Sequence, residues 1–123
     1  MAKKVRLTNV FRTVKVKGAS TGNLAVATAL VNGLSHDGVT YATGDRILLK
    51  AQTTAAENGI YTIVASGAAP RTADWAAGIS VVGYAARVYN GTTLANTVWA
   101  VYAEPAVVGT DDPQFIKHER MGA

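Results

Sequence analysis

At 123 residues, the chain has the length of one domain with a single core. Hydrophobic residues make up 49% of it and charged residues 16%, whereas an ordinary soluble domain is about 25% charged. Its surface therefore carries little charge, which favours a protein whose surface is partly covered by other subunits. It has no cysteine, which excludes disulfides, thiolate chemistry and thiolate metal sites.

Residues 1–17 are predicted to form a basic N-terminal arm. Up to His36 every charged residue is basic, whereas acidic residues outnumber basic ones in the rest of the chain. Apolar and polar residues alternate in the arm, and this period of two predicts short strands over 4–8 and 12–17. The residues that we assign to partner docking are Lys3, Lys4, Val5, Arg6, Leu7, Arg12, Lys15 and Lys17.

The charge of the arm alone does not choose between nucleic acid and an acidic protein surface. A nucleic-acid-binding arm is expected to interleave its basic residues with aromatic side chains that stack on bases, but Phe11 is the only aromatic residue before Tyr41. Docking onto a protein, or adding a strand to a neighbour's sheet edge, also uses an apolar face such as that of Val14 and Val16. We therefore expect a protein partner and no nucleic acid.

Residues 18–123 are predicted to form a single β-domain with a short C-terminal tail. Predicted strands recur about every ten residues between Gly, Asn and Asp, which is typical of a small antiparallel β-sandwich or barrel. They cover residues 39–41, 46–50, 60–65, 79–82, 85–89, 97–102 and 115–117. The first two should meet in a hairpin or a tight corner. Residues 23–31 suit a helix or a strand, and we predict extended structure there, with a turn or single helical turn at 74–78.

We predict that three turn dipeptides, together with the arginine that follows one of them, specify the fold. Glycine adopts turn conformations that other residues resist, and Asp or Asn can bond turn amides. These positions are Asp37, Gly38, Gly44, Asp45, Arg46, Asn58 and Gly59. A polar cluster that fastens the long loop to the predicted hairpin is a further hypothesis. Its members are Asp45, Arg46, Glu57, Arg71 and Asp74.

The aromatic residues divide into two predicted groups. Those expected in the core, rather than on a sugar-binding platform, are Tyr61, Trp75, Trp99 and Phe115. Those expected to line a surface are Tyr84, Tyr89 and Tyr102.

No residue pattern favours catalysis, a metal or a cofactor. His36 and Asp37 are adjacent, and adjacent residues on a strand point to opposite faces, so we expect a surface histidine beside a turn. Two histidines without cysteine make a transition-metal site improbable. Asp111 and Asp112 lack the alternating oxygen ligands of a calcium loop, so a turn before Pro113 is expected. We expect no catalytic residue, no cofactor and no metal.

Several ordered elements between residues 31 and 75 form a specific pattern. An Asp-Gly-Val turn at 37–39 is followed by Gly-Asp-Arg-Ile-Leu-Leu-Lys at 44–50 and Glu-Asn-Gly-Ile-Tyr at 57–61. Arg71 and Asp74 then precede Trp75. This pattern resembles a module of tailed-bacteriophage structural proteins, found in tail fibres, head fibres and small capsid-associated proteins that are usually homo-oligomers.

The resemblance implies a structural role in the virion. The chain departs from the commoner pattern in having Ala51 before Gln52 and in lacking a fibre shaft, which favours a capsid decoration (cement) or head-fibre protein. We expect a homo-oligomer, with a trimer favoured, that binds the major capsid protein or another virion protein and stabilises the shell by avidity. The alternative is a tail-fibre or baseplate receptor-binding module that contacts the host surface.

Enzymatic activity and a membrane location are not expected. No two carboxylates stand out as a catalytic pair. No apolar run approaches the roughly 20 residues needed to cross a bilayer, and no secretory signal follows Met1. We therefore expect a protein that is made in the host bacterial cytoplasm and resides in the virion.

Overall fold

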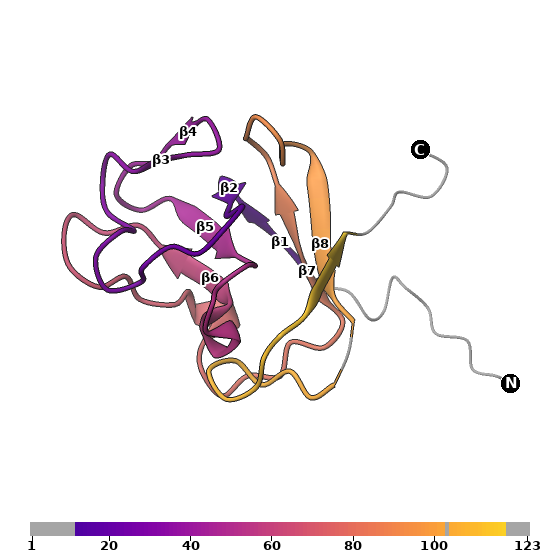
Figure 1. The fold of residues 1–123 in the computed structure, drawn as a ribbon. Coiled ribbons are helices and arrows are strands. Elements are labelled where there is room, and N and C mark those ends of the chain that lie inside the picture. The colour runs from indigo at the N-terminus through magenta and orange to yellow at the C-terminus, as the bar shows by residue number, and fades with distance from the viewer. Residues whose placement is uncertain (1–11, 103, 118–123) are drawn as a thin grey trace, which may run out of the picture.

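The computed structural model describes residues 12–102 and 104–117, arranged as Figure 1 shows. Their regular structure is all strand apart from two 3-10 helices of three residues each. The strands are β1 (Arg12–Val16), β2 (Gly18–Ala19), β3 (Ser35–His36), β4 (Val39–Thr40), β5 (Arg46–Leu49), β6 (Gly59–Thr62), β7 (Tyr84–Val88), β8 (Thr97–Val101) and β9 (Phe115–Lys117). The helices are η1 (Ala55–Glu57) and η2 (Ala73–Trp75). The predicted all-β class is confirmed.

The strands form two larger sheets and one small hairpin. The first sheet has the order β1-β7-β8-β9, the second β2-β5-β6, and β3 pairs with β4. Within the described residues the sheets do not close into a barrel. β1 pairs with β7 and β2 with β5 in parallel, whereas the other pairs are antiparallel. The sheets are therefore mixed rather than antiparallel throughout.

The three-stranded sheet is the middle layer of the fold. Neighbouring residues on a strand point to opposite faces: Leu48 of β5 packs toward the four-stranded sheet, whereas Ile47 and Leu49 pack away from it. The first core cluster contains Val16, Ala19, Leu48, Ile60, Trp75, Val81, Ala86, Val88, Val101, Ala106 and Val108. The second contains Leu30, Val39, Tyr41, Ile47, Leu49, Tyr61, Ile63 and Ala69. Both faces of β5 are covered, so its apolar run is continuous.

The Asp37-Gly38 dipeptide makes a two-residue loop between β3 and β4. Its φ angles are 50° and 76°, the positive values that such a tight hairpin loop requires, and a Cβ at Gly38 would overlap the Thr92 hydroxyl. The next connection is a corner, because β4 pairs with β3 and β5 pairs with β6. The carboxylate of Asp45 accepts a hydrogen bond from the Ala42 amide across this corner.

Residues 23–31 are neither helix nor strand, so the prediction of extended structure is wrong. They form turns in which the amide of Ala29 donates to the carbonyl of Ala25, as in a single helical turn. Leu30 lies fully buried in the second core cluster. The segment therefore takes the shape that covers the middle layer, and its tertiary contacts outweigh the strand preference of its valines.

Two other predicted strands have different outcomes. Residues 79–82 contribute only one isolated bridge, from Ser80 to Val107, because Gly78 and Gly83 both adopt positive φ and turn the chain on either side. The strand predicted over 4–8 lies outside the described residues. The remaining predicted strands and the helical turn at 74–78 coincide with observed elements within a few residues.

The predicted polar cluster forms as separate pairs rather than as one network. Arg46 donates two hydrogen bonds to the carboxylate of Asp74, at 3.2 and 3.0 Å. Asp45 bonds Lys17 instead, at 3.0 Å. Burial alone would raise the pKa of Asp74, but the hydroxyl of Thr72 and the Arg46 guanidinium lower it below its usual value. The two pairs join the corner before β5 to β1 and to η2.

Arg71 fastens the loop between β5 and β6, as the sequence hypothesis required. Its guanidinium donates to the main-chain carbonyls of Asn58 at 3.1 Å and Ala56 at 3.0 Å. Glu57 takes part through the side-chain Nε2 of Gln52, which donates to the Glu57 carboxylate at 3.0 Å. The loop is therefore held by side chains at both of its ends.

Candidate docking surface

One face of the four-stranded sheet has no layer packed on it by the described residues. Its strands direct alternate side chains to opposite faces. The set that packs into or against the first core cluster is Val14, Val16, Tyr84, Ala86, Val88, Trp99, Val101 and Phe115. The register places on the opposite face, here called the outer face, Thr13, Lys15, Ala85, Arg87, Val98, Ala100 and Ile116. Tyr89 and Tyr102 directly follow the core residues that end β7 and β8, so alternation directs their rings to the same side. In Figure 1 the outer face is directed away from β5 and β6.

The outer face carries the exposed large apolar side chains of the described residues. Tyr102 is 59%, Ile116 51% and Tyr89 43% exposed. Between them lie Ala85 and Ala100, which are buried but belong to neither core cluster. Exposed aromatic and aliphatic groups around a centre of small residues form a surface that a protein partner can approach closely.

A basic group occupies one end of the outer face. Lys15 and Arg87 are register partners, and both cations lie over the ring of Tyr89, with Lys15 Nζ 6.0 Å and Arg87 Cζ 5.1 Å from its centroid. Exposed cation–π contacts contribute about 0.5–1 kcal/mol each, so the ring and the two cations restrain one another. This end presents two positive charges on an aromatic support.

A groove of about 390 Å³ runs from this basic end toward β5. Lys17 and Asp45 bond across it at 3.0 Å. Burial alone would raise the pKa of Asp45, but the hydrogen bond from the Ala42 amide and the Lys17 ammonium lower it below its usual value. The charge of Lys17 is therefore satisfied within the chain, whereas Lys15 points to solvent.

An acidic hollow of about 380 Å³ lies next to the start of β9. Its lining residues are Glu104, Pro105, Thr110, Asp111, Asp112 and Gln114. Gln114 directly precedes Phe115, the first residue of β9. The carboxylate of Asp111 accepts a main-chain hydrogen bond within its own loop at 2.9 Å, as expected for a turn. Glu104 and Asp112 are exposed, so their charges face solvent.

The predicted arm is partly built into the fold. The docking residues that lie outside the described part of the chain are Lys3, Lys4, Val5, Arg6 and Leu7. Arg12 and Lys15 are exposed on β1, and Lys17 is half-buried. Val14 and Val16, which we expected to offer an apolar face to a partner, instead pack in the first core region. That expectation is wrong for these two residues, because β7 and the middle layer already cover them.

The aromatic residues follow the prediction with one exception. Those predicted for the core are buried or packed against it, namely Tyr61, Trp75, Trp99 and Phe115. Tyr89 and Tyr102 are exposed as predicted. The prediction that Tyr84 lines a surface is wrong. Its ring packs edge-on against that of Trp75 with centroids 6.1 Å apart, because its position on β7 points to the core.

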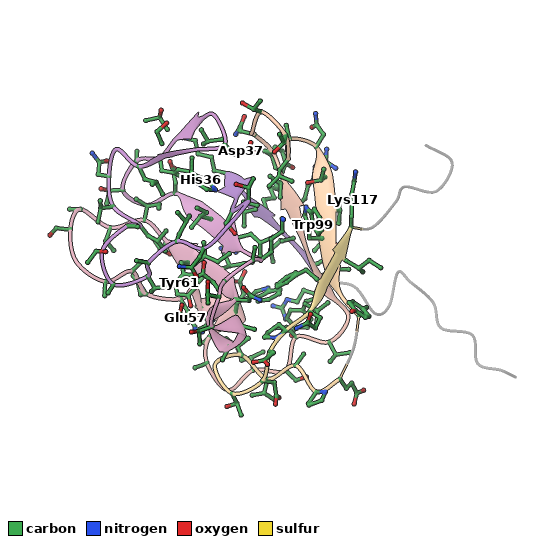
Figure 2. The ribbon with its side chains drawn as sticks, in the orientation of Figure 1. His36, Asp37, Glu57, Tyr61, Trp99 and Lys117 are labelled. Atoms are coloured by element: carbon green, nitrogen blue, oxygen red, sulfur yellow. The ribbon has the colours of Figure 1, made fainter. Side chains whose placement is uncertain are left out.

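Figure 2 labels His36 and Asp37 at the β3–β4 hairpin. The two residues make different contacts, as expected from their adjacency. The Asp37 carboxylate accepts hydrogen bonds from the Thr93 amide at 3.0 Å, its hydroxyl at 2.8 Å and the Leu94 amide at 3.2 Å. Burial alone would raise the pKa of Asp37, but these bonds and nearby His36 lower it. His36 Nε2 accepts from the Thr21 amide at 3.0 Å. Both residues therefore anchor the β3–β4 hairpin to neighbouring loops.

Sequence reasoning missed Ile116 as part of the outer face. One signal was present: in 97–102, Val98 and Tyr102 alternate with the core residues Trp99 and Val101, so both faces of that strand are apolar. A strand with two apolar faces at the outside of a fold indicates a covered second face.

Within residues 12–102 and 104–117, no group of three or more His, Asp or Glu side chains could hold a metal ion. The same residues contain no helix long and apolar enough to span a membrane. Comparison with protein-family models, curated proteins and solved structures finds no match. Among the described residues, the outer face with its basic end is the surface that bears on function.

Proposed function

We propose that the chain is a structural protein of a tailed-phage virion. In this proposal it is a capsid decoration or head-fibre protein that binds the shell and stabilises it through oligomeric protein–protein contacts, and it catalyses no reaction. The observation that carries the proposal is the outer face, where Tyr102 and Ile116 are both more than half exposed. A monomer that works alone gains nothing from such a face, whereas a subunit of an assembly buries it.

Two features of the sequence support the same role. The pattern of residues 37–39, 44–50 and 57–61 resembles that of phage structural proteins. In addition, only 16% of residues are charged, which suits a protein whose neighbours cover much of its surface.

We assign attachment to the shell to the basic residues at the start of the chain. Lys3, Lys4 and Arg6 precede β1, and β1 is an edge strand of the sheet that carries the outer face. Exposed ion pairs contribute only about 0–1 kcal/mol each, so one subunit would hold the shell weakly. Several subunits joined in an oligomer would hold it firmly, because each further attachment is intramolecular.

Co-sedimentation with empty shells tests the attachment. Purified chain should sediment with shells assembled without it, and the triple variant Lys3→Gln, Lys4→Gln, Arg6→Gln should lose most of this binding. Lys117→Gln, which removes an exposed charge from β9, is the control and should bind as before. Wild-type protein that stays in the supernatant, or that binds whole host cells instead, would overturn the decoration role, and the second result would favour the receptor-binding alternative.

Particle stability tests the cement function. Phage particles lacking the protein should lose infectivity and release DNA at a lower temperature than intact particles. Adding the purified chain back should restore heat resistance. Equal resistance of stripped and intact particles would remove shell stabilisation from the proposal.

A further inference from the structure

The sequence contains three Asn-Gly dipeptides, at 32–33, 58–59 and 90–91. In such a dipeptide the main-chain nitrogen of the glycine can attack the amide carbon of the asparagine side chain, because glycine has no Cβ to obstruct the approach. The reaction needs water or hydroxide to remove the N–H proton, a glycine amide that donates no hydrogen bond, and an asparagine side chain that is free to rotate. The structure distinguishes the three dipeptides by these requirements.

Burial protects Asn58 from this reaction. The residue is 5% exposed, its Oδ1 accepts a hydrogen bond from the Gln52 amide at 2.9 Å, and its Nδ2 donates to the Pro113 carbonyl at 3.4 Å. Gly59 is buried as well. Water therefore reaches neither reacting group while the chain is folded.

Hydrogen bonds protect Asn32, although it is exposed. Its Oδ1 accepts from the Thr43 amide at 2.9 Å, which holds the side chain. The amide of Gly33, which would be the attacking group, donates to the carbonyl of Tyr41 at 2.8 Å. Both contacts must break before the nitrogen can reach the side-chain carbon.

Asn90 meets all three requirements. Its side chain is exposed, and neither it nor the main-chain amide of Gly91 has a hydrogen-bond partner among the described residues. The dipeptide borders an open hollow of about 410 Å³ that Lys17 also lines. The groove of about 390 Å³ that extends toward β5 is lined by Asn90 together with Lys15 and Lys17. Nearby ammonium groups favour the negative charge that develops on the oxygen of the attacked amide.

We propose that Asn90 is a site of spontaneous deamidation. The Gly91 nitrogen loses its proton to water or hydroxide and forms a bond to Cγ of Asn90. The bond from Cγ to Nδ2 then breaks as the side-chain nitrogen takes up a proton and leaves as ammonia. Water adds to one of the two carbonyls of the resulting cyclic imide and breaks its bond to the ring nitrogen. The product is an aspartate or, when water adds to the other carbonyl, an isoaspartate.

The product changes the charge at the basic end of the outer face. Asn90 directly follows Tyr89, whose ring lies under the cations of Lys15 and Arg87. A carboxylate at this position lowers the formal net charge of +4 by one. The positive charge of the basic end therefore decreases as the protein ages. This inference concerns the chain by itself and does not depend on the proposed function.

Peptide mapping by mass spectrometry tests the site in the purified full-length chain, incubated at mildly alkaline pH. Trypsin cleaves after lysine and arginine, which places the three dipeptides in the separate peptides 18–46, 51–71 and 88–117. Fragmentation of 88–117 should assign the conversion to Asn90. Asn90 should convert at least about tenfold faster than Asn32, where two hydrogen bonds must break first. The rate should rise with pH, because the attacking amide must lose its proton.

Two controls separate the effect of the fold from that of the dipeptide. In guanidinium chloride all three dipeptides should convert at comparable rates, and the incubation continues until they have done so. Asn90→Gln should remove the early conversion from peptide 88–117, because closure through the longer side chain is slower. The proposal would be overturned by an Asn90 that stays intact in the folded chain while the denatured chain converts. Equal rates at the three dipeptides in the folded chain, or early conversion that persists in Asn90→Gln, would also overturn it.

Discussion

Replacing Arg71 by methionine should destabilise the protein by removing the contacts that hold the loop between β5 and β6. The guanidinium donates to the carbonyls of Asn58 and Ala56 at 3.1 and 3.0 Å and lies 5.0 Å from the ring centroid of Tyr61. Methionine keeps the length of the side chain but donates no hydrogen bond. A hydrogen bond to a charged group contributes about 1.5–3 kcal/mol, and partial exposure reduces this, so we expect a loss of about 2 kcal/mol in total.

Thermal unfolding followed by circular dichroism measures this loss. With an unfolding entropy of about 2.1 cal/mol/K per residue, 2 kcal/mol corresponds to a decrease in Tm of roughly 8 °C for a chain of this length. The Tm of Arg71→Lys should lie between those of the wild type and Arg71→Met, because one ammonium cannot span both carbonyls as a planar guanidinium does. Arg12→Met, at an exposed position of β1, is the control and should change Tm little. A Tm for Arg71→Met within 2 °C of the wild type, a threshold of roughly 0.5 kcal/mol, would show that Arg71 does not fasten the loop.

Two further predictions concern a close approach in the core and acid stability. A Cβ at Gly18 would overlap the hydroxyl of Tyr41, so Gly18→Ala should cost about 1–3 kcal/mol in urea unfolding. The cost should shrink in a Tyr41→Phe background, since that hydroxyl has no partner among the described residues, and an undiminished cost would locate the strain elsewhere. The lowered pKa values of Asp45 and Asp74 mean that the folded state binds protons less readily than the unfolded chain, so their stabilisation is complete above the unfolded pKa of about 3.9 and is lost as pH falls through the lower folded values. Tm should therefore fall below about pH 4, and Asp45→Asn with Asp74→Asn should make this fall shallower; an equally steep fall would assign it to other groups.

The strands that could be predicted from the sequence are those whose local residue pattern is compatible with no other structure. The run Ile47-Leu48-Leu49 follows a turn dipeptide and is buried on both faces, and Asp37-Gly38 fixes the hairpin that it closes. Local chemistry decides such elements, so the pattern suffices.

The segments that could not be predicted depend on contacts far along the chain. Residues 23–31 take their shape from the face of β5 and β6 that they cover, and β1 joins β7, which lies some seventy residues later. Parallel pairing over such a distance leaves no turn signal between the strands. The basic residues of β1 were therefore assigned to an arm, although Val14 and Val16 belong to the sheet.

The candidate surface was predictable only in its parts. Tyr89 and Tyr102 were expected at a surface, and Lys15 was expected to dock. The arrangement of Lys15, Arg87 and Ile116 on one sheet face follows from the register of β1, β7, β8 and β9. Register is set by pairing between distant strands, which a single sequence does not display.

Immunogold labelling of intact, purified phage particles tests the central claim most directly. Antibody against the chain should label the head evenly, at many sites on every particle. Label confined to the tail tip, or absence of the protein from purified particles, would contradict a decoration protein that works by covering the shell.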